Sequence, residues 1–151
     1  MTTLKERLTA DMRAAMKSRD ELTTSTLRMA LAAVGVAEVA GKAKRELSDD
    51  EVLSVLAKEA KKRTEAATAF ADAGRAEQAA KERAEEAVLT RYLPKQLSDE
   101  EIQELVRATL AGGRFEGKGA MGAAMKAAQA AAAGRADGGK LAAEVRRQLG
   151  L

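Results

Sequence analysis

The sequence predicts an all-α protein. Alanine, leucine, glutamate, lysine and arginine dominate its 151 residues, and all five are strong helix formers. Aromatic residues make up only 2%, and β-branched residues are sparse, which disfavours a sheet. The only proline, Pro94, interrupts the helical pattern. We therefore expect an N-terminal helical hairpin or bundle over residues 1–95, followed by a small C-terminal three-helix bundle over residues 96–151.

Two helices are expected in the first third of the chain. The first spans residues 3–17 and the second spans residues 21–40, because apolar side chains recur in both at helical spacing. Gly41 suits the position just beyond a helix end. Gly35 lies inside the second helix at a cost of about 1 kcal/mol relative to alanine, which indicates a close approach between helices.

Two further helix starts share one sequence signature. Leu-Ser-x-x-Glu occurs at Ser48–Glu51 and again at Ser98–Glu101. The serine hydroxyl can accept from the backbone N–H three residues on, and the glutamate can accept from the serine N–H. These capping boxes predict helices over residues 49–73 and 99–111.

The remaining helices follow from glycine and alanine patterns. Residues 77–91 are helical after Gly74, the alanine-rich residues 120–133 form the next helix, and a short helix carries Leu141, Val145 and Leu149. The glycine-rich loop of residues 112–119 nearly spells a phosphate-binding loop. It lacks the hydroxyl that holds magnesium, and a helix precedes it where that motif requires a strand, so we read it as a flexible connection.

Composition excludes several kinds of site. The chain has no histidine and no cysteine, so the usual general base, thiolate nucleophiles and the usual metal ligands are missing. We expect no catalytic residues, metal or cofactor. No apolar run reaches the roughly 18 residues of a membrane helix, and no secretory signal is evident, so a cytoplasmic location is expected. The net charge of +3 is only mildly basic.

One helix face gathers cations at helical spacing, namely Lys58, Lys61 and Lys62. Arg63 lies nearer the apolar stripe, where a charge needs a partner. We expect Arg63 to pair with Glu82 and Glu86 of the next helix, with Glu85 adding to them. Two interpretations stay open for the lysines. They form structural ion pairs within the protein, or they contact phosphate groups of a ligand. A loop with Lys42, Lys44 and Arg45 extends the basic group.

Several motifs together resemble the YqeY family. They are Leu27-Arg28-Met29, Leu47-Ser48-Asp49-Asp50-Glu51-Val52, Lys58-Glu59-Ala60-Lys61-Lys62-Arg63, Phe70, Gly74-Arg75, Glu82, Tyr92-Leu93-Pro94-Lys95-Gln96-Leu97-Ser98 and Met121-Gly122-x-x-Met125-Lys126. The resemblance covers nearly the whole chain. Members of this family are similar to the C-terminal tail domain of the GatB component of the aspartyl/glutamyl-tRNA amidotransferase, and that tail contacts tRNA. The resemblance therefore implies an all-helical fold in two parts and a role beside tRNA.

The leading hypothesis is an accessory module for tRNA or another structured RNA. Its candidate contacts are Lys58, Lys61, Lys62, Arg75, Lys42, Lys44, Arg45 and Lys126. The family is associated with carbon–nitrogen ligase activity that uses glutamine as amide donor. We do not transfer that activity, because the phosphorylating and glutamine-hydrolysing sites of the amidotransferase lie elsewhere in that enzyme. The alternative is a protein adaptor without RNA, docking on another component of the amidotransferase or on a ribosomal protein through Met121, Met125 and the alanines of residues 127–133.

Overall fold

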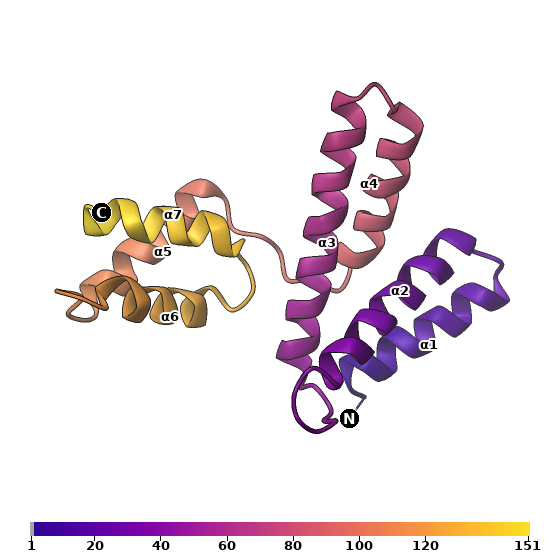
Figure 1. Ribbon diagram of the computed structural model, residues 1–151, viewed down its shortest axis with the longest axis horizontal. Coiled ribbons are helices and arrows are strands. Elements are labelled where there is room, and N and C mark those ends of the chain that lie inside the picture. The colour runs from indigo at the N-terminus through magenta and orange to yellow at the C-terminus, as the bar shows by residue number, and fades with distance from the viewer. Residues whose placement is uncertain (1) are drawn as a thin grey trace. The chain divides into compact units, whose positions relative to one another are not determined.

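Residues 2–151, the part of the chain that the structure describes, form seven α-helices and no strand in the computed structural model (Figure 1). The prediction of an all-α protein is confirmed. The helices are α1 (Leu4–Lys17), α2 (Glu21–Glu38), α3 (Asp49–Asp72), α4 (Ala76–Thr90), α5 (Asp99–Ala111), α6 (Ala120–Ala132) and α7 (Gly138–Leu149). None of these described helices has both the length and the apolar composition that crossing a membrane requires.

Reciprocal side-chain caps start three of the helices. The two predicted capping boxes are present. The Ser48 hydroxyl accepts a hydrogen bond from the Glu51 N–H at 3.2 Å, and the Ser98 hydroxyl accepts one from the Glu101 N–H at 3.1 Å. A third box joins Thr3 to Glu6 at the start of α1. Each cap satisfies backbone donors that a helix leaves unpaired in its first turn. The local sequence therefore sets these boundaries.

The end of α2 differs from the prediction. The helix ends at Glu38, and Val39 is its C-cap residue. The sequence predicted a helix that continues to residue 40, just before Gly41. The Glu38 carbonyl accepts from the Arg45 N–H at 3.0 Å, so the chain already turns back at this point. The carboxylate of Glu38 is buried and paired with Lys5 at 2.9 Å, which fixes this turn against α1. A long-range contact thus overrides the local pattern.

The expectation of close packing at Gly35 is wrong. A Cβ added at Gly35 would lie within 4 Å of no atom of the described residues outside the adjoining backbone of its own helix. The missing side chain therefore faces open space, and no contact inside the protein accounts for a glycine there.

The first unit of the chain extends through Leu93 and consists of two helical hairpins. Figure 1 shows α1 beside α2 and α3 beside α4, with α2 also meeting both helices of the second hairpin. Its core draws on all four helices and consists of Leu8, Leu27, Ala30, Val34, Val52, Leu56, Ala60, Val88 and Leu89. Burial of these side chains supplies the main driving force for assembling the hairpins.

Tyr92 ties the end of α4 to α1. Its hydroxyl donates to Asp11 Oδ2 at 2.6 Å, and the Arg7 guanidinium lies 4.9 Å from the ring centroid. Burial, followed by the hydrogen bond to Asp11, raises the pKa of the Tyr92 hydroxyl to about 12. The ring is engaged on its face and at its hydroxyl, so Tyr92 serves the fold rather than base stacking.

The second unit, Pro94–Leu151, contains α5, α6 and α7 packed on one another. The division falls between Leu93 and Pro94, two residues before the boundary expected from the sequence. The buried core of this unit consists of Ile102, Val106, Ala124, Ala128, Ala132, Leu141 and Val145. Met121 and Met125 pack against it from α6. The methionine side of α6 is therefore used inside the unit.

Candidate nucleic-acid interface

The loop between α2 and α3 presents two lysines to solvent. Lys42 and Lys44 are exposed, and within residues 2–151 neither forms an ion pair. Arg45 differs, because its Nη1 donates to Glu51 Oε1 at 2.9 Å and its Nη2 pairs with Glu51 Oε2. The pairing with Arg45, followed by the hydrogen bond from the Ser48 backbone, lowers the pKa of Glu51 to about 2. Two cations of this loop are therefore available to a phosphate, and the third is occupied.

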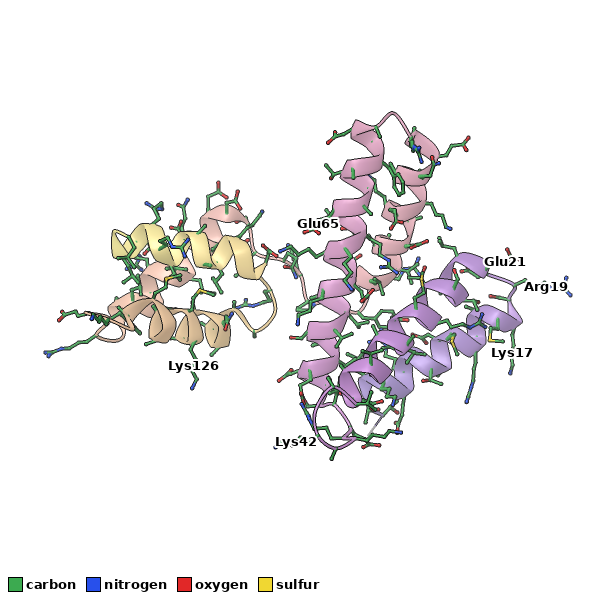
Figure 2. The ribbon with its side chains drawn as sticks, viewed as in Figure 1. Lys17, Arg19, Glu21, Lys42, Glu65 and Lys126 are labelled. Carbon is green, nitrogen blue, oxygen red and sulfur yellow. The ribbon has the colours of Figure 1, made fainter. Side chains whose placement is uncertain are left out.

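The exposed face of α3 carries the predicted lysines together with acidic neighbours. Lys58, Lys61 and Lys62 are all exposed, as the helical spacing predicted. Lys62 Nζ lies 3.3 Å from Glu59 Oε1, whereas Lys58 forms no ion pair with any described residue. Glu65 shares the exposed side of α3 and is labelled in Figure 2. The face is therefore basic in its middle and acidic beyond it.

Lys58 and Arg45 meet at one hollow beside the start of α3. The hollow measures about 440 Å³ and is lined by Ala37, Arg45, Leu47, Asp50, Glu51, Ser54, Val55 and Lys58. Its two cations are matched by the carboxylates of Asp50 and Glu51. This balance makes the hollow itself a poor site for an anion, and leaves the exposed cations Lys58, Lys42 and Lys44 as the candidates.

Two of the predicted contacts are not part of this group. Arg75 follows the C-terminus of α3, where its N–H donates to the Phe70 carbonyl at 2.8 Å. The rise of a helix places it about 20 Å or more from Lys58. Lys126 is exposed on α6 in the second unit (Figure 2). The structure thus places Arg45 and Lys58 around one hollow, with Lys42 and Lys44 in the loop just before Arg45, and Arg75 and Lys126 stay predictions of the sequence.

Arg63 lies in a cluster of charges between α3, α4 and α2. Its side chain is 11% exposed, with Nη1 at 3.1 Å from Glu59 Oε2 and Nε at 3.3 Å from Glu85 Oε2. Glu85 is 7% exposed and Glu59 is 14% exposed. Nη2 also approaches the Met29 sulfur at 3.6 Å. Nε is near enough to Glu85 for an ion pair but is not aligned for a hydrogen bond.

The partners of Arg63 correct the prediction from sequence. Within residues 2–151, Glu82 and Glu86 form no ion pair, and the contacts come from Glu85 on α4 and Glu59 on α3 itself. Glu85 shares the buried side of α4 with Val88 and Leu89, which lie three and four residues further on. The side chain of Glu86 leaves the helix about 100° around its axis from that of Glu85, so it does not share the buried side. Of the three carboxylates expected to meet Arg63, Glu85 therefore pairs with it, and Glu59 of α3 takes the place of Glu82 and Glu86.

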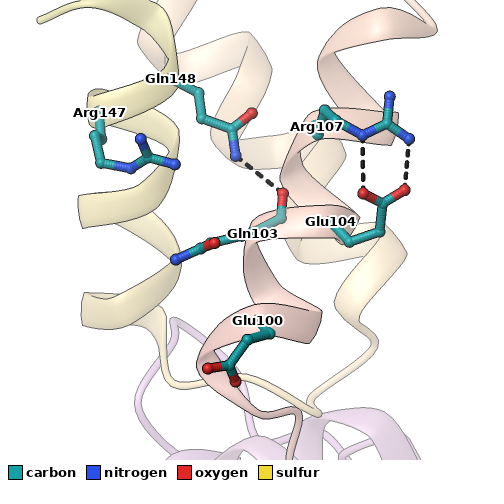
Figure 3. A pocket seen from close by; sticks show the side chains of 6 residues that line it. All are labelled: Glu100, Gln103, Glu104, Arg107, Arg147 and Gln148. Carbon is teal, nitrogen blue, oxygen red and sulfur yellow. Dashed lines mark hydrogen bonds and ion pairs between the residues drawn. The ribbon is translucent and has the colours of Figure 1, made fainter.

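A hollow of about 450 Å³ in the second unit offers little to an anion. Figure 3 shows that it lies between α5 and α7, where Arg107 Nε donates to Glu104 Oε2 at 2.8 Å and Gln148 donates to the Gln103 carbonyl at 2.9 Å. Its other arginine, Arg147, pairs with Glu144 at 3.0 Å. Both cations of this hollow are therefore already engaged by carboxylates.

The glycine-rich loop follows α5, so no strand precedes it. A Cβ at Gly113 would lie 2.9 Å from the Phe115 ring, and Gly117 and Gly119 have φ values of 74° and 88°. These glycines therefore serve a tight connection onto the core of the second unit. Among the described residues, no group of three or more acidic, histidine or cysteine side chains is arranged to hold a metal ion.

The family model described as "Yqey-like protein" matches residues 5–149, which is nearly the whole chain. No curated protein matches the chain.

Proposed function

Since the chain belongs to the YqeY-like family, we propose that it is an accessory module that binds structured RNA, with tRNA as the first candidate. The observation that supports this is the group of Lys42, Lys44 and Lys58, which are exposed and form no ion pair with a described residue. Exposed cations of this kind suit the phosphate backbone of an RNA. We define them, together with Arg45, as the basic segment.

Recognition through the basic segment would depend on shape and phosphate rather than on base edges. The three aromatic residues of the chain are Phe70, Tyr92 and Phe115. Tyr92 is held by Asp11 and Arg7, Phe115 packs on the core of the second unit, and Phe70 is half-buried on α3. Stacking on unpaired bases needs exposed aromatic faces, so contacts to the backbone of a folded RNA fit this surface better. The relation to glutamine-dependent amidotransferases rests on family resemblance, and the proposal includes no catalysis.

The adaptor alternative has less support. It placed a docking surface on the methionine and alanine side of α6, yet Met121 and Met125 pack against the core of their own unit. The large exposed apolar side chains among the described residues are Met16, Leu22, Met29, Val36, Val39 and Leu151. None of these lies on α6, so the proposed function does not rely on that helix.

Charge reversal tests the basic segment. The variant Lys44→Glu/Lys58→Glu is expected to weaken binding of fluorescein-labelled bulk tRNA by more than about tenfold and to reduce the salt slope by about two. Anisotropy titrations over a salt series measure both quantities. The matched control is Arg13→Glu/Lys17→Glu on α1, which changes the net charge equally at exposed cations that form no ion pair with a described residue. Equal losses in the two variants would contradict a localised site, because only the total charge would then matter.

Removing the partner of Arg45 should have the opposite effect. Glu51→Gln keeps the cap on Ser48, because glutamine also serves at this position of a capping box. It releases the Arg45 guanidinium and removes a nearby negative charge. We expect the affinity for tRNA to rise about twofold to tenfold and the salt slope to steepen by about one. The same anisotropy series checks this, and an affinity that falls or stays unchanged would argue that RNA does not contact the basic segment.

A further inference from the structure

The outer side of α2 carries a row of exposed apolar side chains. Leu22 is 36% exposed, Met29 42%, Val36 68% and Val39 57%. The first three follow one another at intervals of seven residues. Ser25, Ala32 and Val39 lie three residues after each of them in turn. These six positions form the a and d positions of a heptad pattern, and we call them the α2 stripe.

The α2 stripe differs from the core face of the same helix, although at Met29 it borders α3, because Arg63 Nη2 lies 3.6 Å from the Met29 sulfur. Thr26, Leu27, Ala30, Val34 and Glu38 are the buried residues of α2 and lie on its other side. The stripe contains no charged residue over about 27 Å of helix. Exposed large apolar side chains in one row, interrupted by Ser25 and Ala32, are typical of a surface that a partner covers.

Gly35 adds a second observation at the edge of the stripe. A glycine inside a helix costs about 1 kcal/mol relative to alanine. No contact within the described residues requires it, because a Cβ at this position would meet open space. The side of the helix where it lies is solvent-facing, next to Ala32 and Val39 of the stripe. A smooth surface there suits the close approach of an external backbone.

We propose that the α2 stripe pairs with the stripe of a second copy of this chain, with the two helices antiparallel. Antiparallel pairing of a positions with d positions sets Leu22 opposite Val39 of the second copy, Ser25 opposite its Val36, and Met29 opposite its Ala32. In the four inner layers a large side chain meets a small one, so the surface is complementary to itself. Self-complementarity is what a twofold interface requires.

The flanking residues support the same orientation. Glu21 lies at the start of α2 and Lys42 just beyond its end, as Figure 2 shows. Antiparallel pairing brings Glu21 of each copy towards Lys42 of the other, whereas parallel pairing would bring like charges together. In the same register Arg28 lies over Gly35 of the other copy, where the absent side chain leaves room for the guanidinium. Charge and size therefore favour one orientation.

The size of the interface limits its strength. One helix of this length, with alanine and serine in the seam, buries less than the roughly 800 Å² per partner of a standard interface. The association is therefore weak and needs concentrated protein to be seen. We expect a reversible dimer with a dissociation constant of roughly 10–500 µM.

Sedimentation equilibrium from micromolar to about 1 mM protein tests the dimer. Val36→Glu should weaken association at least about tenfold, because a charge then enters the seam. Leu151→Glu is the matched control, since Leu151 is 71% exposed and lies in the other unit. Helicity of both variants is checked by circular dichroism. A protein that stays monomeric throughout the range, or a dimer that Val36→Glu leaves unchanged, would overturn the proposal.

Disulfide formation tests the orientation. The chain has no cysteine, so single cysteines can be introduced without a background. An oxidised mixture of Ser25→Cys and Val36→Cys proteins should yield mostly the mixed disulfide, because these positions face each other only in the antiparallel pair. Predominant Ser25→Cys homodimers would overturn the antiparallel arrangement. The dimer would bring Lys42 of the basic segment towards Glu21 of the other copy, so the two proposals share that residue. The Lys44→Glu/Lys58→Glu variant leaves Lys42 in place, and Val36→Glu lies outside the basic segment, so loss of tRNA binding in the first and loss of the dimer in the second are separate results.

Discussion

Replacement of Arg63 by alanine is expected to destabilise the first unit by about 3–5 kcal/mol. The guanidinium lies between two largely buried carboxylates, at 3.1 Å from Glu59 and 3.3 Å from Glu85. Without it, both carboxylates stay in a site with little water and lose their cation. Lys81 also approaches Glu85, but it lies at 4.0 Å and its side chain is largely exposed. The penalty is therefore the cost of burying unpaired charge, with the lost packing against Met29 added to it.

Urea unfolding, followed by hydrogen exchange of peptides from residues 4–93, measures this loss. The control is Arg107→Ala, which removes an arginine from an exposed pair with Glu104 and should change stability by less than about 1 kcal/mol. The triple variant Glu59→Leu/Arg63→Met/Glu85→Leu should recover most of the stability, because a buried ion cluster can be replaced by apolar side chains. Arg63→Ala and Arg107→Ala variants of equal stability would show that the cluster is not buried in solution.

The sequence predicted the helices well because the signals for them are local. Ser48 and Glu51 lie three residues apart, and the cap that they form depends on little else. The same holds for Ser98 and Glu101. The end of α2 was missed because it depends on Lys5 and Arg45, which contact Glu38 from distant parts of the chain. Local patterns specify helix starts here, and tertiary contacts decide where one helix stops.

The sequence predicted which residues belong to the candidate site better than it predicted the ion-pair partners of its charged side chains. Helical spacing correctly placed Lys58 on an exposed face. The choice of Glu85 over Glu82 and Glu86 depends on how α3 and α4 rotate against each other, which the spacing within one helix does not contain. The pairing of Glu59 with Arg63 was within reach, because residues four apart are neighbours on a helix.

The α2 stripe also went unnoticed in the sequence. Its heptad positions alternate large apolar residues with Ser25 and Ala32, and apolar residues also recur on the core face of the same helix, so spacing alone does not separate the two sides. Only the burial of Leu27 and Val34 shows which side of α2 faces inward. Once that side is known, Leu22, Met29 and Val36 become an exposed row.

Leu141→Ala is expected to unfold the second unit while the first stays folded. Leu141 is 1% exposed, and three of the seven buried residues in its core are alanines. Alanine buries little area, so the few larger side chains carry most of the hydrophobic stabilisation. Truncation of a buried leucine costs about 2–5 kcal/mol. A bundle of the size of Pro94–Leu151 holds only about 3–9 kcal/mol in total.

Limited proteolysis at a fixed temperature, read by mass spectrometry, distinguishes the two units. In Leu141→Ala, cleavage should appear within residues 94–151 at sites that the parent protein protects, and a fragment that ends near Leu93 should persist. Leu151→Ala is the control, because an exposed terminal leucine should change stability by less than about 0.5 kcal/mol. If Leu141→Ala instead made residues 4–93 equally susceptible, the two units would unfold as one. The division at Pro94 would then describe how the chain is arranged but not how it unfolds, because loss of the core of the second unit would also unfold the first.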